Sequence, residues 1–137
     1  MRLSSIELGI LSLLEANRRA RNNHRMAMLG TRDYALQHAV VRLNPGRQTG
    51  KTLAALRLSE REDAILVAAD AYPFLSGSEY GAGCMSTPCK TNDYRWVRSY
   101  SRIWIDEPSR VFNGSYSLED FIADTFIGTQ TYIILGE

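Results

Sequence analysis

The segment Asp-Ala-Ile-Leu-Val-Ala-Ala at residues 63–69 is apolar at every position after the first, without polar alternation. Strands that are covered on both faces have this pattern, and they occur in parallel sheets whose connections are helices. Apolar strands are also expected over residues 37–43, 103–107 and 131–135, with helical segments between them. This alternation predicts a three-layer α/β domain with a mostly parallel, four-stranded sheet and right-handed crossovers.

The N-terminal region predicts an added helix. Ser4 or Ser5 can cap a helix that runs toward Arg25, with Glu7 in its first turn. Its apolar positions have helical spacing, and we expect this face to pack on the sheet: Ile6, Ile10, Leu13 and Leu14. A chain of 137 residues is long enough for one domain. We therefore expect a single domain, 1–137, with a helical segment at 1–36 and a core at 37–137.

The remaining elements are predicted from local signals. A second short helix is expected over Thr31–Ala39, after Gly30. Residues 72–92 have no clear period and are expected to form a long loop. Ser117 can cap a helix that Gly128 would end, before the last strand.

A phosphate-binding turn is predicted after the first strand. The turn ends in Gly50-Lys51-Thr52 and precedes a plausible helix over residues 52–61. In a strand–turn–helix of this kind, backbone N–H groups bind phosphates, the lysine contacts the β- and γ-phosphates, and the hydroxyl binds Mg²⁺. The pattern G-x-x-x-x-G-K-[ST] is incomplete, because Pro45 occupies the place of its first glycine and Gly46 follows.

Two adjacent carboxylates end a later strand. Ile103-Trp104-Ile105-Asp106-Glu107 is followed by Pro108, which we expect to disfavour a helix. Carboxylates at the end of a buried strand are costly unless they face a metal or a solvent-filled cleft. Asp106 would bind the hydrated Mg²⁺, and Glu107 would polarise the attacking water. The alternative is a strand that runs into an acidic turn. Asp70, after the apolar run at 63–69, would lie at the same sheet edge.

The two motifs resemble those of the P-loop NTPases, with a Walker A motif at Gly46–Thr52 and a Walker B motif at Ile103–Glu107. The Asp-Glu pair resembles the division whose catalytic glutamate directly follows the Walker B aspartate. The loop Arg47-Gln48-Thr49-Gly50-Lys51-Thr52 is similar to that of phage and herpesvirus terminases, which package DNA. The resemblance implies the strand order 1-4-3-2, and implies that Arg47 faces the γ-phosphate. The implied nucleotide-binding residues are Gly46, Arg47, Gln48, Thr49, Gly50, Lys51 and Thr52.

The leading functional hypothesis is an Mg²⁺-dependent ATPase that works as a homo-oligomer, such as a small viral motor that acts on nucleic acid. A neighbouring subunit would supply an arginine, for which Arg98, Arg102 and Arg110 are candidates; an ordinary surface arginine is the alternative for each. A second hypothesis is a nucleotide-binding or assembly module with little or no hydrolysis. A small-molecule kinase ranks last, because no arginine-rich lid follows the Walker B motif.

Charge is unevenly distributed. Residues 1–62 contain eleven Arg/Lys and five Asp/Glu, whereas residues 63–137 contain five and ten. The basic excess is concentrated at Arg18, Arg19, Arg21 and Arg25. Such a cluster can neutralise nucleic-acid phosphates. A solvated helix face and a docking surface for the acidic half of a neighbouring subunit are the alternatives.

Neither membrane insertion nor secretion is expected. No apolar run approaches the roughly eighteen residues needed to span a bilayer, and residues 6–14 lack a signal-peptide pattern. Cys84 and Cys89 have no neighbouring histidine and are expected to be free thiols rather than zinc ligands. We therefore expect a cytoplasmic protein, in the host cell if it is viral.

Overall fold

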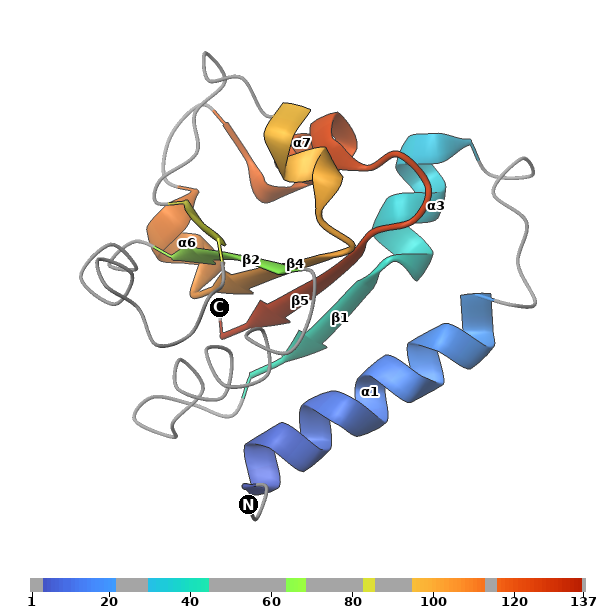
Figure 1. Cartoon of the computed structure of the whole chain (residues 1–137), viewed down its shortest axis with the longest axis vertical. Helices are drawn as coiled ribbons and strands as arrows, with labels where there is room; N and C mark the ends of the chain where they lie inside the picture. Colours follow the sequence, from blue (N-terminus) through green and yellow to red (C-terminus); the bar gives the residue numbers. More distant parts are fainter. Residues whose placement is uncertain are drawn as a thin grey trace.

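The computed structural model describes residues 4–21, 30–44, 64–68, 83–85, 95–112 and 116–136. The predicted phosphate loop at 46–52, the helix expected after it, Asp70 and Arg25 lie outside these residues. Helices flank a single sheet in an α/β arrangement (Figure 1). Within the described part of the chain, no helix is long and apolar enough to cross a membrane.

The described residues form five strands of one sheet, and each described pair of neighbours is parallel. The strands are β1 (Val40–Leu43), β2 (Ala64–Ala68), β3 (Gly83–Met85), β4 (Arg102–Asp106) and β5 (Thr131–Leu135). Their spatial order is β1-β5-β4-β2-β3. The predicted order of the four longer strands is confirmed, because β5 inserts between β1 and β4. The edge strand β3 was not predicted, since three residues that include a glycine carry no recognisable period.

The sheet separates two apolar layers, as the continuous apolar strands predict. On one face, Ile10 and Leu14 of α1 (Ser5–Arg21) share an apolar layer with Val41 of β1 and with alternate side chains of β2, β4 and β5. On the other face, α3 (Thr31–His38) and α7 (Leu118–Thr125) cover the larger core. Figure 1 shows α1 on one side of the sheet and α3 and α7 on the opposite side. Burial of each large apolar side chain in these layers contributes about 1.5–3 kcal/mol.

A capping box begins α1. The N–H of Glu7 donates to the Ser4 hydroxyl at 3.2 Å, and that hydroxyl donates to the Glu7 carboxylate at 3.0 Å. Ser4 is therefore the N-cap, and Ser5 is the first helical residue. The predicted apolar face is confirmed for Ile10 and Leu14. Leu13 lies on the flank of the helix instead and is 36% exposed.

Two predicted boundaries around β1 and β4 were wrong. The first strand begins at Val40 and not at residue 37, because Thr31–His38 form α3. Pro108 does not exclude a helix: it begins α6 (Pro108–Val111), with Glu107 as the N-cap. The first helical position needs no N–H donor, and the proline ring fixes the φ angle that this position requires.

The end of α7 also differs from the prediction. Ser117 caps this helix as expected, since its hydroxyl accepts from the N–H of Asp120 at 3.1 Å. The helix ends at Thr125, however, and Phe126 is extended, so Gly128 lies beyond the helix.

Buried hydrogen bonds join α7 to β5. The Thr125 hydroxyl donates to the Phe121 carbonyl at 2.8 Å and lies 2.6 Å from the Tyr132 hydroxyl. The Gln130 amide donates to the Thr125 carbonyl at 2.8 Å and accepts from the N–H of Ile127 at 2.8 Å. Burial raises the pKa of the Tyr132 phenol, so this hydroxyl remains protonated and available as a donor.

Candidate functional site

The carboxyl ends of β1, β5 and β4 meet at one edge of the sheet. The N–H of Gly136, just after β5, donates to the Leu43 carbonyl at 2.9 Å, and the N–H of Glu107 donates to the Leu135 carbonyl at 2.7 Å. The chain therefore leaves β1 at the edge that also carries Asp106 and Glu107 (Figure 1). Ligands of open parallel sheets bind outside this edge.

Asp106 is a buried carboxylate at the last position of β4. It pairs in register with Ala68 of β2 on one side and Leu135 of β5 on the other, and it is 7% exposed. Burial of a carboxylate is costly unless positive charge or hydrogen bonds compensate it. Its oxygens belong to the hard donors that Mg²⁺ prefers, and the metal-binding role of Asp106 stays a prediction.

Glu107 has an uncommon backbone conformation. With φ 52° and ψ 72°, it is the only non-glycine residue with positive φ among those the structure describes. This left-handed conformation is unfavourable for an L-residue, and such strain often occurs at functional sites. The half-buried Glu107 side chain follows directly on the buried Asp106.

The Glu107 carboxylate lies directly over Gly136. A Cβ atom added to Gly136 would be 2.7 Å from the Cδ, Oε1 and Oε2 atoms of Glu107. Gly136 also has φ +91°, a conformation that favours glycine. The end of β5 thus provides a surface without a side chain on which the carboxylate rests. Sequence reasoning missed this role; its only signal was a glycine directly after an apolar strand.

The three arginines that are candidates to act in the site of a neighbouring subunit lie in different parts of the structure. Arg98 donates two hydrogen bonds to the Asp124 carbonyl, at 3.0 and 2.6 Å, and so has a structural contact. Arg102 begins β4 and therefore lies at the opposite edge of the sheet. Arg110 is exposed on α6, and its N–H donates to the Glu107 carbonyl at 3.0 Å. Of the three, only Arg110 lies close to the candidate site.

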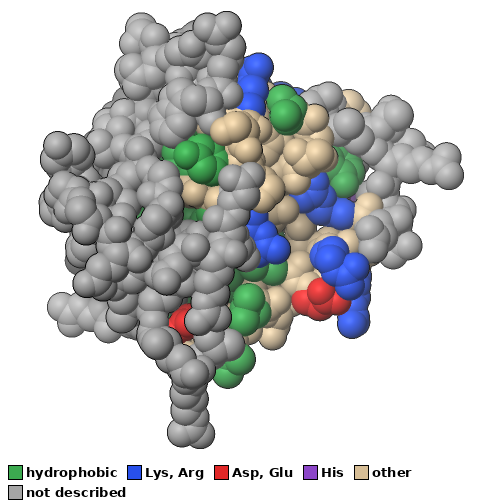
Figure 2. Space-filling view, in the orientation of Figure 1, with side chains coloured by type: hydrophobic (Ala, Val, Ile, Leu, Met, Phe, Trp, Pro, Cys, Tyr) green, Lys and Arg blue, Asp and Glu red, His purple; other side chains and the backbone are tan. Residues whose placement is uncertain are grey.

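The described arginines near the end of α1 are largely engaged by the protein itself. Arg18 and Arg19 both bind the Glu15 carboxylate, at 2.7 and 3.0 Å. Hydrogen bonds from Arg18 are the main cause that lowers the pKa of Glu15 to about 2. Figure 2 shows blue basic side chains beside a red acidic one on the side of the molecule where α1 lies. The positive charge of this surface is thus partly neutralised.

Arg21 has a structural role that the nucleic-acid interpretation did not include. Its guanidinium donates to the Thr131 hydroxyl at 2.8 Å, the Gln130 carbonyl at 3.0 Å and the Gly128 carbonyl at 3.5 Å. It also donates to the Tyr34 hydroxyl at 3.3 Å, and its Cζ lies 5.7 Å from the centre of that ring. Arg21 therefore attaches α1 to α3 and to the connection that precedes β5.

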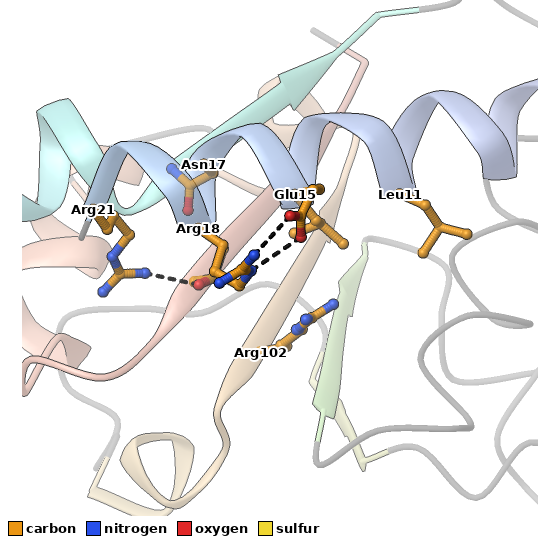
Figure 3. Close-up of a pocket in the computed structure, with 8 residues that line it drawn as sticks. Leu11, Glu15, Asn17, Arg18, Arg21 and Arg102 are labelled. Carbon is orange, nitrogen blue, oxygen red and sulfur yellow. Dashed lines mark hydrogen bonds and ion pairs between the residues drawn. The ribbon is translucent and has the colours of Figure 1, made fainter. Parts of the chain in front are cut away.

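A cavity of about 420 Å³ lies between α1 and the amino-terminal ends of β4 and β5. Figure 3 shows its lining, which includes Arg18, Arg21 and Arg102. This cavity is at the opposite end of the strands from Asp106 and Glu107.

The structure brings together only part of the predicted site. Asp106 and Glu107 lie at the edge where β1 ends, as expected. Lys51, Arg47 and Thr52, with the rest of 46–52, lie outside the described residues, so their distance from the carboxylates is untested. The described residues contain no group of three or more His, Cys, Asp or Glu side chains that could bind a metal ion.

Comparison with known proteins gives no family assignment: no protein-family model, curated protein or solved structure matches the chain.

Proposed function

We propose that the protein binds a nucleoside triphosphate, ATP in the first instance, together with Mg²⁺, and hydrolyses it. The observation that carries the proposal is the placement of Asp106 and Glu107 at the edge where β1 leads into Arg-Gln-Thr-Gly-Lys-Thr. The strand order supports it as well, because β5 lies between β1 and β4, the two strands whose ends lead into the two motifs.

Each residue has a defined role in this proposal. The backbone of residues 46–52 and the Lys51 ammonium bind the phosphates, and Arg47 faces the γ-phosphate. The Thr52 hydroxyl and the Asp106 carboxylate hold Mg²⁺, which neutralises charge on the phosphates. Glu107 accepts a proton from the attacking water; its carboxylate is held over Gly136, next to the end of β1.

We further propose that this ATPase is a viral DNA-packaging motor that works in the cytoplasm of a host cell. Arg110 supports an oligomeric form of this proposal, since it is exposed beside Glu107 and can act in the site of a neighbouring subunit. DNA that stimulates hydrolysis would support a motor.

The test is phosphate release from ATP and Mg²⁺ by the wild type, Lys51→Ala and Glu107→Gln. Glu119→Gln is the matched control, because Glu119 is an exposed glutamate of α7, the helix that packs on the larger apolar core. We expect Glu107→Gln to lower turnover about 10²- to 10⁴-fold while ATP still binds, since general-base catalysis has this magnitude. Lys51→Ala should abolish binding, and Glu119→Gln should change neither.

Other outcomes have distinct meanings. Binding that depends on Lys51 without turnover would identify a nucleotide-binding or assembly module. Wild-type turnover in Glu107→Gln would exclude Glu107 as the base, and no nucleotide binding by the wild type would refute the proposal.

A further inference from the structure

The described lining of the cavity between α1 and the sheet carries a net positive charge. Arg18 and Arg21 enter it from α1, Arg102 enters it from the first position of β4, and Glu15 is the one carboxylate among its described lining residues. The three guanidinium groups and this carboxylate give the described part of the lining a formal charge of +2. Figure 3 shows the Arg102 side chain pointing toward α1, on the side where Arg18 and Glu15 lie. A cationic concave surface of this kind favours an anionic ligand.

The charge of Arg21 is not cancelled by its hydrogen bonds. The four oxygens that accept these hydrogen bonds are uncharged: two are hydroxyl oxygens, of Tyr34 and Thr131, and two are backbone carbonyl oxygens, of Gly128 and Gln130. These hydrogen bonds also fix the guanidinium, so a ligand would meet a positive charge whose position is already set. Pre-organisation of this kind reduces the entropy that binding costs.

Arg18 retains hydrogen-bonding capacity in spite of its ion pair. Its Nε and Nη2 atoms donate to Glu15, at 3.0 and 2.7 Å, and its Nη1 atom takes no part in those two bonds. A guanidinium has five N–H donors in a planar fork that matches phosphate oxygens.

Leu11 and Leu14 add an apolar wall to the same cavity. A volume of about 420 Å³ exceeds what a single inorganic anion needs and lies in the range of sites for small organic ligands. The combination fits a phosphate group attached to an organic portion that contacts the leucines.

We propose that this cavity binds a phosphate ester, through Arg18, Arg21 and Arg102, at a site separate from the carboxyl edge of the sheet. The phosphate can belong to a small phosphomonoester or to a nucleic-acid backbone. This binding does not depend on nucleotide hydrolysis, because none of the described residues that line the cavity belongs to the candidate ATP site.

The test measures binding of phenyl phosphate by calorimetry and of a fluorescent single-stranded DNA by anisotropy, at fixed ionic strength. The variants are Arg18→Ala and Arg102→Gln, and the matched control is Arg19→Ala. Arg19 binds the same Glu15 carboxylate but does not line the cavity. Loss of a hydrogen bond to a charged group corresponds to about tenfold weaker binding, which we expect for Arg18→Ala and Arg102→Gln. Arg19→Ala should change affinity less than about twofold.

Glu15→Gln supplies a test of opposite sign. This change removes the negative charge from the cavity and releases Arg18, so phenyl phosphate should bind more tightly than to the wild type. Lys51→Ala should leave the affinity unchanged, which distinguishes the cavity from the candidate ATP site.

If phenyl phosphate binds the wild type and binds Arg18→Ala and Arg102→Gln more weakly, a small phosphomonoester is enough to occupy the cavity. DNA binding with the same pattern and no phenyl phosphate binding identifies the backbone phosphate as the ligand. Equal losses in Arg18→Ala and Arg19→Ala, or no binding of either probe by the wild type, would overturn the proposal.

Discussion

Gly136→Ala tests how Glu107 is positioned, because the added methyl group would occupy the place of the Glu107 carboxylate. The new Cβ would lie 2.7 Å from three atoms of that carboxylate, whereas ordinary contact begins at 3.4 Å. The carboxylate must therefore move by about 0.7 Å, the difference between these distances. A displacement of about 1 Å can lower catalysis about 10²-fold, so we expect turnover of the proposed ATPase to fall about 10- to 100-fold.

Gly30→Ala is the matched control. Gly30 also has positive φ, at +81°, but a Cβ there would meet nothing within 4 Å. Each alanine should destabilise the fold by about 1–3 kcal/mol, because Gly30 has φ 81° and ψ 160° and Gly136 has φ 91°, conformations that favour glycine. Steady-state phosphate release at saturating ATP should then be lowered only in Gly136→Ala, with KM nearly unchanged.

A second readout does not depend on activity. In a double-mutant cycle measured by urea unfolding, Glu107→Ala should relieve the strain of Gly136→Ala by about 0.5–1 kcal/mol. Equal turnover in Gly136→Ala and Gly30→Ala would refute a catalytic requirement for the Glu107 position, and additive unfolding energies would refute the steric argument itself.

Three further predictions concern stability. Tyr132→Phe should lower the free energy of unfolding by about 1–2 kcal/mol in urea titrations, because it removes the buried hydroxyl that lies 2.6 Å from Thr125; an unchanged midpoint would contradict this. Ser4→Ala should cost about 1 kcal/mol through loss of the α1 cap, while Ser5→Ala, at the next position, should change the urea midpoint little. The pKa of Glu15 is lowered from 4.5 to about 2 in the folded state, so its ion pairs contribute stability above pH 4.5 that is lost as the pH falls toward 2. The small stability difference between wild type and Glu15→Gln should therefore shrink over this range; a difference that grows on acidification would show that the sign is wrong.

The sheet was largely predictable because its strands carry their own signal. Residues 64–67 and 103–105 are buried on both faces of the sheet, and continuous apolar runs report this burial directly. The position of β5 between β1 and β4 followed from the resemblance and not from spacing. The edge strand β3 has no such signal, since its backbone hydrogen bonds to β2 do not require any side-chain pattern.

Boundaries and the site's fine geometry depended on contacts that are distant in sequence. The end of α7 at Thr125 accompanies the hydrogen bonds that this residue makes with Gln130 and Tyr132 of the following segment. The left-handed backbone of Glu107 and its contact with Gly136 join two strand ends that are far apart along the chain. Composition and periodicity describe one segment at a time, so they cannot predict such contacts.

The position of β5 has a consequence for how the protein is made. Val40 pairs with Tyr132, so β1 has its only described strand partner 92 residues further along the chain (132 minus 40). Contacts between such distant residues slow folding, because a long loop must close before they form. During synthesis, β1 and β4 emerge from the ribosome before β5, so the strand edges that β5 pairs with in the folded protein are still unpaired. Until residues 131–135 are released, these edges are open to pairing with other chains, and a chaperone that covers them would raise the yield of folded protein.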